Sequence, residues 1–548
     1  MSTNANPVGM SEQPAASAWG AFAYPAFAVV WVADVAALIG VAIYDAASGW
    51  LMTTLNAEPQ AVSSVQVATN LSMFLFTLPA GALADIVDSR RCLIAVSAGV
   101  AVLMAAFGAL VAFGLATPAL LVATTFILSG ALALNGPAWL AIVPGLVSRA
   151  ELDGAVAAGG IGYNLSRVIG PALGGFAIVT FGLSSPFLIF AAANLVAIAC
   201  LLWRRPRRRR KESLPAERLT SAIRVGLRHA ASNPPLRATM IRAAAIYLFV
   251  SAYLSLLPLI ARAQVAQGPR FYGILLCAIS VGAILGSLVI TPLKARLGPD
   301  RVVAFGSLAT AVALVLFGLA RGPALALVAC VLAGAAWTLV LTSLYVAAQD
   351  SLPDWVRGRG LSIFLTVIFG SMTIGSLVWG EVAAVAGIPA AQYLAAAGAL
   401  IAIPLTWRWD IGAAERFDVA PARDWRPPTL RRAVDDDEGP VMVSVDYRVD
   451  PAKRDAFLAA LAQLGLERRR EGGFAWGIFE DGIEEGRFVE SYLIDSWLEF
   501  RHLRERVTNC DLMLEEQIRA LLTAEPRIAF LIAPEPRARR WSLGYRRA

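Results

Sequence analysis

The sequence repeats long apolar stretches that carry no charge, and this recurrence limits the folds open to the chain. Residues 1–89, for example, hold no Lys or Arg. A hydrocarbon core of about 30 Å needs roughly 20 apolar residues to be crossed by a helix. In lipid each backbone N–H and C=O must be paired within the segment, so repeated stretches of this length predict a helical bundle. We expect twelve spans, at residues 22–44, 62–84, 93–114, 119–142, 155–180, 184–203, 241–261, 271–292, 302–320, 324–347, 361–385 and 391–408.

The composition supports a membrane protein and argues against other classes. Charged residues make up 16% of the chain, whereas soluble domains have about 25%. The net charge of +7 comes from basic residues clustered beside the predicted helix ends, which indicates membrane orientation rather than nucleic-acid binding. The five Cys are scattered without C-x-x-C spacing, so we expect no metal site, no structural disulfide and no cofactor.

The basic residues fall on one side of the predicted bundle. With twelve spans and both termini on one side, that side holds Arg90, Arg91, Arg149, residues 204–211, Lys294, Arg296, Arg301, Arg357 and Arg359. The opposite side holds Arg262, Arg270 and Arg321. By the positive-inside rule the basic side is cytoplasmic. We therefore predict a multi-pass protein of a bacterial inner (plasma) membrane with both termini in the cytoplasm.

Changes in composition divide the chain into seven parts. A polar N-terminal cytoplasmic tail (1–20) lacks the basic region of a cleavable signal peptide. The other parts are a six-helix bundle (21–203), a basic central cytoplasmic loop with an amphipathic helix (204–238), a second six-helix bundle (239–410), a linker (411–439), a soluble domain (440–535) and a basic tail (536–548).

The soluble domain has a pattern of its own. Alternating apolar residues predict strands at 441–447, 474–478, 489–493 and 528–532, with helices at 451–466 and 495–522. The order βαββαβ is typical of a ferredoxin-like α+β domain. The predicted fold class is thus an all-α membrane protein of twelve helices in two six-helix bundles, with a small ferredoxin-like domain at its C-terminal side.

Two carboxylates lie in the first apolar segment, where an ionised side chain is costly. Asp34 and Asp45 are eleven residues apart, which places them within about 20° on one helix face and roughly three turns apart. We interpret them as lining a central pathway, where they take up protons or bind a cationic group. The alternatives are that Asp45 marks the helix end, since Ser48 and Gly49 follow, and that Asp34 forms a structural ion pair.

The fifth segment carries the candidate partner of these acids. Asn164, Arg167 and Pro171 share one helix face, and pairing of Arg167 with Asp34 or with Glu381 of the eleventh segment is expected on energetic grounds. Such a pair can be structural or proton-linked. Small residues in this segment favour close helix packing, and Pro171 frees a backbone carbonyl one turn earlier. They are Gly170, Gly174 and Gly175. Neither His is a candidate, because His229 is placed on the surface helix and His502 in the soluble domain.

The plan of six helices, a basic loop and six helices resembles the major facilitator superfamily. Residues 81–85 (Gly-Ala-Leu-Ala-Asp), with Arg90 and Arg91, resemble its cytoplasmic loop motif after the second helix. The chain departs from that motif, which usually has Arg, Gly and a basic residue, at Ile86, Asp88 and Ser89. Residues 286–301 resemble the same motif in the second half, as internal repeats would produce.

Other stretches resemble a narrower group. Residues 166–175 are similar to the antiporter motif of drug and metabolite exporters, with Ser166 in place of the usual first Gly. Three stretches look like the enterobactin-exporter-like branch, the transmembrane secretion effectors: residues 78–85, 135–139 and 349–357. The soluble domain is similar to the dimeric α+β barrel (antibiotic-monooxygenase-like) modules appended to many members.

The resemblance implies roles for the motif residues. The bend at Pro171 would govern closure toward one side; the alternative is a tight helix crossing with no bearing on direction. Asp85 would accept hydrogen bonds from the N-terminus of the eleventh helix, or else fix topology as a loop residue. Arg90 and Arg91 would form cytoplasmic ion pairs.

The expected function is secondary active transport by alternating access, as a proton-coupled exporter of an amphipathic small molecule such as a siderophore, drug or metabolite. The alternatives are an uptake permease or facilitator and, from another class, a membrane-anchored enzyme or sensor. We predict no enzymatic activity. The expected partners are the substrate, protons, membrane lipid (including contact of the basic tail with anionic lipid) and a second copy of the chain through the soluble domain, which acts as a dimerisation or regulatory module.

Overall fold

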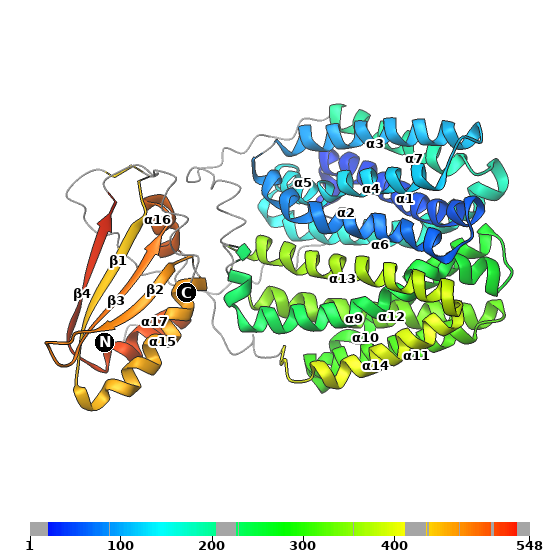
Figure 1. Cartoon of the computed structure of the whole chain (residues 1–548). Coiled ribbons are helices and arrows are strands. Elements are labelled where there is room, and N and C mark those ends of the chain that lie inside the picture. Colours follow the sequence, from blue (N-terminus) through cyan, green and yellow to red (C-terminus); the bar gives the residue numbers. More distant parts are fainter. Residues whose placement is uncertain are drawn as a thin grey trace, which may run out of the picture.

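The computed structural model consists of a helical bundle and a C-terminal α/β domain (Figure 1). It describes residues 20–86, 88–203, 226–227, 229–353, 356–411, 434–435, 438–470, 472–505 and 509–533. The predicted N-terminal and C-terminal tails, the basic run, most of the surface helix and most of the linker lie outside the described residues.

Eleven helices among the described residues are long and apolar enough to cross a membrane. They are α1 (Pro25–Leu55), α2 (Pro59–Ile86), α3 (Ser89–Ala112), α6 (Leu152–Phe181), α7 (Ser185–Trp203), α9 (Pro234–Leu259) with the π-helical turn η4 (Ile260–Gln264), α10 (Pro269–Leu297), α11 (Pro299–Leu319), α12 (Pro323–Asp350), α13 (Arg357–Ala386) and α14 (Ile388–Thr406). Short 3-10 turns are η1 (Gly20–Ala23), η2 (Val143–Gly145) and η3 (Arg149–Glu151).

The segment predicted at 119–142 differs from the others. It forms the shorter apolar helix α4 (Pro118–Ala133), followed by a separate helix α5 (Asn135–Ile142). The break falls at Leu134, whose N–H bonds to Ala131 O at 3.3 Å in a tight turn. Pro137, just beyond, has no N–H to continue the helical ladder. The predicted fourth span therefore corresponds to two shorter helices, which join the eleven longer ones.

Proline and glycine set the helix ends. Seven of the apolar helices begin with Pro, which suits the first helical position because its missing N–H has no helical partner there. Three helices end at a glycine with positive φ: Gly182 (90°), Gly298 (77°) and Gly387 (88°). The first helix is longer than predicted, because α1 continues through Ser48 and Gly49 to Leu55.

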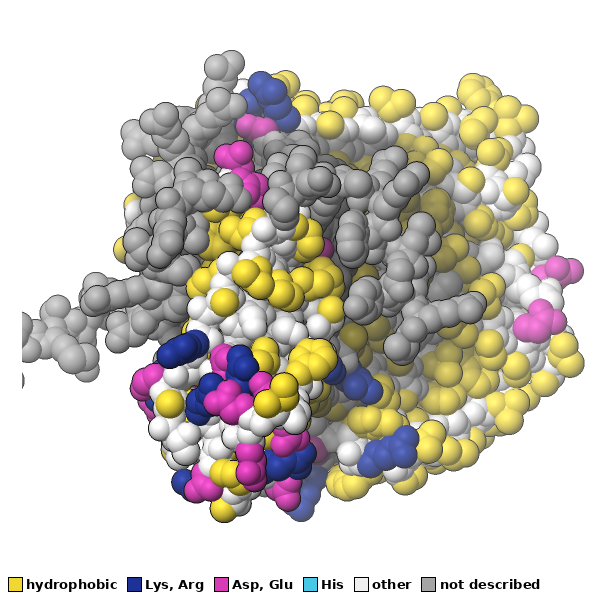
Figure 2. Space-filling view, turned by 60° about the vertical axis from the view of Figure 1, so that its left-hand side comes forward, with side chains coloured by type: hydrophobic (Ala, Val, Ile, Leu, Met, Phe, Trp, Pro, Cys, Tyr) yellow, Lys and Arg dark blue, Asp and Glu magenta, His cyan; other side chains and the backbone are white. Residues whose placement is uncertain are grey.

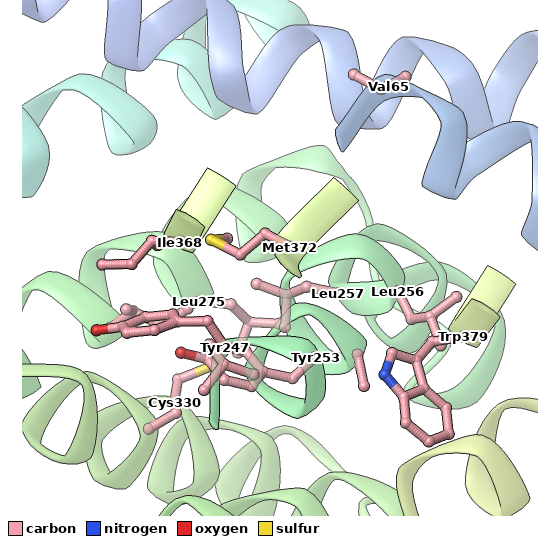
Figure 3. Close-up of a cluster of buried hydrophobic side chains, with 14 of the residues drawn as sticks. Val65, Tyr247, Tyr253, Leu256, Leu257, Leu275, Cys330, Ile368, Met372 and Trp379 are labelled. Carbon is pink, nitrogen blue, oxygen red and sulfur yellow. The ribbon is translucent and has the colours of Figure 1, made fainter. Parts of the chain in front are cut away.

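The helices form two halves that lie side by side (Figure 1). In the N-terminal half α1 packs against α6 and α7, while in the C-terminal half α9 packs against α13 and α10 against α12. The halves meet along two seams, α2 with α13 and α6 with α10. One hydrophobic core spans both: Val65 of α2 belongs to the cluster that contains Tyr253, Cys330 and Met372 of the C-terminal half (Figure 3).

The outer surface of the bundle is apolar. Figure 2 shows hydrophobic side chains over the visible flank of the bundle, whereas Lys, Arg, Asp and Glu gather on the C-terminal domain. Val102 of α3 is 71% exposed and Leu288 of α10 is 70% exposed. Large apolar side chains at such exposure are matched by lipid rather than by water. The chain is therefore a multi-pass membrane protein.

Arg242 on α9 binds the C-terminal end of α14. Its buried guanidinium contacts the Asp300 carboxylate at 2.6 Å and donates to the carbonyls of Thr406 (3.3 Å) and Trp407 (3.4 Å). These carbonyls belong to the last turn of a helix, where a cation is favoured. Asp300 also accepts the N–H of Ile411, the residue at which the described bundle ends, at 3.3 Å.

The end of the predicted surface helix, just before α9, differs from the expectation in the burial of His229 and in the role of Asn233. His229 is buried, and its Nε2 lies 3.3 Å from the side-chain nitrogen of Asn233. Asn233 does not simply end that helix but caps α9, because its side chain accepts the N–H of Leu236 at 3.1 Å. The histidine was thus wrongly placed on a surface.

The C-terminal domain has the predicted βαββαβ order. Its elements are β1 (Val441–Val449), the 3-10 turn η6 (Pro451–Lys453), α15 (Arg454–Arg470), β2 (Phe474–Glu480), β3 (Arg487–Ile494), α16 (Trp497–Glu505), α17 (Asn509–Arg519) and β4 (Leu522–Ile532). The strands form one antiparallel sheet in the order β2-β3-β1-β4. The single helix predicted at 495–522 is described as two, and β4 begins six residues earlier than the predicted 528.

A buried carboxylate organises the helix-facing side of this sheet. Glu490 of β3 is 0% exposed, and its two oxygens accept from Tyr447 O–H and Trp476 Nε1–H, each at 2.8 Å. Burial, together with the charge of Glu490, raises the pKa of Tyr447, so the phenol keeps the proton that it donates. Both carboxylate oxygens are therefore satisfied by donors from neighbouring strands.

We expect Glu490→Ala to destabilise the C-terminal domain by roughly 3 kcal/mol, because it leaves two buried donors without an acceptor. Hydrogen–deuterium exchange of the β1 and β3 amides in the full chain measures the change. Glu485→Ala, at an exposed turn position, is the control and should leave exchange within about 0.5 kcal/mol of wild type. Equal protection in both variants would contradict this prediction.

Candidate functional site

Asp45 is an exposed carboxylate in the otherwise buried middle part of α1. It lies in the body of α1 rather than at the helix end, so the interpretation of this residue as a helix-end marker is wrong. Its neighbours Tyr44, Ala46 and Ala47 are buried, whereas the Asp45 side chain is exposed. Asp34, three turns earlier on α1, is half-buried and forms no ion pair with any described residue.

A second charged residue, Arg167, lies on α6. The guanidinium donates to Tyr163 O–H at 3.3 Å and lies 5.8 Å from the centroid of that ring. Arg167 and Asp45 form no direct ion pair in the described structure. Asn164, one turn earlier, is exposed and donates to Gly160 O at 2.9 Å.

The expected pairing of Arg167 with Asp34 or Glu381 is therefore not found. Glu381 lies near the far end of α13, where its carboxylate accepts from Gln60 Nε2 at 2.8 Å. In the described structure this carboxylate thus binds a neutral amide from α2 rather than a guanidinium. The sequence placed Asp34, Asp45, Arg167 and Glu381 in one pathway. In the described structure none of these four side chains forms a direct ion pair with another.

Pro171 opens a hydrogen-bonding position that the other half fills. Because proline has no N–H, the carbonyl of Arg167, four residues earlier, lacks its helical donor. Ser280 Oγ of α10 donates to this carbonyl at 2.8 Å, and Cys277 Sγ donates to Val168 O at 2.9 Å. The freed carbonyl that the sequence predicted is thus a junction between the halves, with its donor on α10.

The glycines of α6 lie where two helices approach closely. A Cβ on Gly170 would come within 2.5 Å of Ala42 Cβ on α1, and one on Gly174 within 3.1 Å of Ile43 O. A Cβ on Gly175 would come within 2.7 Å of Pro269 O on α10. These glycines therefore set the distance of α6 from α1 and from the opposite half.

The loop motif after α2 is described in part. Asp85 lies in the last turn of α2, but its side chain is outside the described part of the structure. The Arg90 side chain binds the end of α7: its Nε donates to Leu201 O at 2.9 Å and its Nη2 to Leu202 O at 3.5 Å, and no ion pair of Arg90 is found among the described side chains. The free carbonyls of that helix end attract the cation. Arg91 donates its backbone N–H to Asp88 Oδ1 at 3.0 Å.

The two halves are joined at the end opposite the basic loops, here called the distal end. It comprises Gly387 and the loops at residues 56–58, 113–117, 182–184, 265–268 and 320–322. Arg262 of η4 reaches across to α1, donating to Thr53 O (2.5 Å), Thr53 Oγ1 (3.1 Å) and Thr54 Oγ1 (3.3 Å). Thr53 O belongs to the last turn of α1, so the cation meets a carbonyl without a helical donor.

The sequence did not single out Arg262. It stood only as one of few charges on the less basic side, and no sequence signal marks the π-helical turn that aims it. Gln264 holds that turn in place by donating to Phe317 O and Ala320 O, both at 2.6 Å. The hydrogen bonds between the halves that are given above lie in the middle of the bundle or at the distal end.

Comparison with known proteins is consistent with this architecture. The profile of a family described as "Transmembrane secretion effector" matches residues 16–538. The chain is 28% identical over 414 residues to the multidrug efflux pump Tap of Mycobacterium tuberculosis, covering 73% of this chain and 96% of that protein. It is 25% identical over 354 residues to Tap of Mycolicibacterium fortuitum, covering 62% and 85%.

Solved transporters share the fold. A point mutant of the nucleoside transporter NupG superposes with a TM-score of 0.58 at 14% identity, covering 70% of this chain and 99% of that one. A bacterial homologue of the lysosomal transporter Spinster, in an inward-facing and unoccupied conformation, gives 0.55 at 13% identity, covering 72% and 96%. With the profile matching nearly the whole chain, the protein belongs to the transmembrane secretion effector family of major facilitator superfamily transporters.

Proposed function

We propose that the chain is a proton-coupled exporter that moves an amphipathic small molecule by alternating access. The observation that carries this proposal is that Asp45 of α1 and Arg167 of α6, two opposite charges on helices that pack against each other, are both exposed within the apolar bundle. Charged groups at this depth are costly and are retained where a substrate or ion passes. The chain's similarity to multidrug efflux pumps supports export rather than uptake.

Asp34 and Asp45 supply a route for protons. Both are on α1, and the described residues contain no metal-binding cluster and no histidine near them, so carboxylates would carry the coupling ion. We place Asn164 and Arg167 on the same pathway and assign Glu381 to its distal end. Gly170, Pro171, Gly174 and Gly175 would form the hinge on which α6 moves against α10.

The distal contacts support a carrier that is closed at one end. Arg262 and the Gln60–Glu381 hydrogen bond join the halves there, and the Ser280 and Cys277 hydrogen bonds join them at mid-depth. The basic end is cytoplasmic in our proposal, which makes this an inward-facing state in a bacterial inner membrane with both chain termini in the cytoplasm. Asp85, Arg90 and Arg91 would then act at the gate that closes in the opposite state.

The C-terminal domain is proposed to join two copies of the chain rather than to act as an enzyme. The sheet face turned away from the helices carries apolar side chains: Phe479 is 61% exposed and Leu531 is 52% exposed. Cross-strand neighbours on the same face are Met442, Val489 and Leu493. A second sheet packed on this face would cover them.

Cells that express the chain should accumulate less of an exported dye, antibiotic or catecholate siderophore than empty-vector cells. Asp45→Asn and Asp34→Asn, and a protonophore added to wild type, should each return accumulation to the empty-vector level, because each removes the proton exchange. Asp153→Asn, an exposed position at the start of α6, is the control and should export normally. Higher accumulation with the wild type, or indifference to the protonophore, would favour a facilitator.

Arg262→Ala should raise the population that is open at the distal end by roughly tenfold, because it removes charge-assisted hydrogen bonds worth about 1.5–3 kcal/mol. Spin labels at Leu115 and Ala324, in a variant whose native cysteines are replaced, report this as a longer distance in electron double resonance. Arg321→Ala removes the same charge at the same end, on a side chain with no hydrogen bond to the other half in the described structure. An unchanged distance distribution for Arg262→Ala would refute the proposal that Arg262 holds the distal end closed.

Phe479→Asp should convert a dimer into a monomer, since it places a charge in the proposed sheet–sheet contact. Light scattering of the purified full chain gives the molecular mass. Met513→Asp changes an equally apolar, 53% exposed residue on the helix α17 and should leave the dimer intact. A wild-type monomer, or dimers of both variants, would exclude this contact.

A further inference from the structure

The C-terminal domain holds a pocket between its sheet and its helices. The helices α15 and α17 contact each other and lie along one face of the sheet (Figure 1). The empty space between helices and sheet is ≈ 550 Å³, part of it open to solvent. Its apolar lining comes from β1, α15, α17 and β4: Val445, Leu464, Ile518, Leu522, Pro526 and Ile528. Pockets that hold small organic molecules have this size and kind of lining.

The described helices cover β1 more completely than β4. Val445 of β1 and Ile528 of β4 are partners across the sheet, and both line the pocket. Val445 is buried, whereas Ile528 is 48% exposed. A large apolar side chain that meets water in a concave surface favours an apolar occupant, because the occupant removes that surface from water.

The charged residues of the lining decide which end group an occupant can carry. Among the described lining residues they are Arg468, Glu515 and Arg519. The buried Arg468 donates from Nη2 to Glu515 Oε1 at 2.8 Å, so these two charges balance each other. Arg519, one turn beyond Glu515 on α17, is 63% exposed, and its Nε lies 4.0 Å from the exposed carboxylate of Glu525. An ion pair so open to water contributes little, and the lining itself therefore carries a net positive charge.

We propose that this pocket binds a small apolar molecule with one carboxylate, whose apolar part covers Ile528 and whose carboxylate binds Arg519. A guanidinium can hold a carboxylate through two parallel hydrogen bonds, and such a ligand takes the place of the distant Glu525. An amine would meet Arg519 with a like charge, and a neutral molecule would forgo the attraction. The pocket is on the helix-facing side of the sheet, whereas the proposed contact between two copies uses the opposite face. The proposal concerns the C-terminal domain alone and does not depend on the transport function.

One naphthalene scaffold tests this with three end groups. The probes are 2-naphthoate (anion), 2-naphthamide (neutral) and 2-naphthylmethylamine (cation), titrated calorimetrically into the full chain in nanodiscs of zwitterionic lipid, with empty nanodiscs as the reference. The anion should bind at least about tenfold more tightly than either of the others. Hydrogen–deuterium exchange should show its protection at α17 and β4. Arg519→Gln should lower the affinity for the anion to that for the amide, and Ile528→Trp should abolish binding, because the indole fills the pocket.

Two control variants keep loss of fold apart from loss of binding. Arg527→Gln removes the same charge from β4 between two lining residues, where the alternation of a strand turns the side chain to the other face of the sheet. Met513→Trp adds the same ring at an exposed position of α17 outside the lining. Both should bind 2-naphthoate as the wild type does. Equal affinity for the three probes, preference for the amine, no binding, protection confined to the helical bundle, or wild-type affinity in Ile528→Trp overturns the proposal.

Discussion

The close approach of α6 to its neighbours is the constraint on which the rest of the bundle depends. Gly170 and Gly174 allow α1 to lie against α6, and Gly175 lets α10 approach from the opposite half. Without a hydrophobic driving force between helices in lipid, such contacts rely on packing and on hydrogen bonds between helices. Pro171 supplies the second of these, since the carbonyl that it frees is taken up by Ser280. One helix thereby fixes both the interior of its own half and its seam with the other.

The position of the two central charges follows from that packing. Because α1 lies directly against α6, Asp45 and Arg167 stand on neighbouring helices, and both side chains are exposed. A buried pair in direct contact would satisfy itself and would stabilise one arrangement of helices. A pair held apart instead leaves both charges dependent on what enters. Charges that are held apart in this way are typical of a binding site, whereas a direct ion pair is typical of a structural contact.

Much of the architecture could be predicted from the sequence, because spans in lipid must be long, apolar and internally bonded. The apolar stretches, the Pro and Gly residues at helix ends and the alternating pattern of β1 each reflect a local rule. The break at Leu134 and the extension of α1 to Leu55 were missed because tertiary packing, rather than hydropathy, decides where a helix stops. The partners of Glu381 and Arg90 depend on which helix ends meet in space, and so does the burial of His229. The π-helical turn that directs Arg262 has no sequence signal at all.

The anchoring of α14 by Arg242 has a mechanical consequence. The guanidinium donates hydrogen bonds to the final carbonyls of α14. Asp300, its ion-pair partner, accepts the N–H of Ile411, the last described residue before the linker. A force applied to the chain after Ile411 would therefore act on α9 and α11 as well as on the end of α14. The chain that leads to the C-terminal domain therefore leaves the bundle from a helix end that is held firmly within the C-terminal half. If two copies associate through the sheets of their C-terminal domains, that contact is attached to the C-terminal half of each copy. The N-terminal half of each copy would then move without being held by the dimer contact.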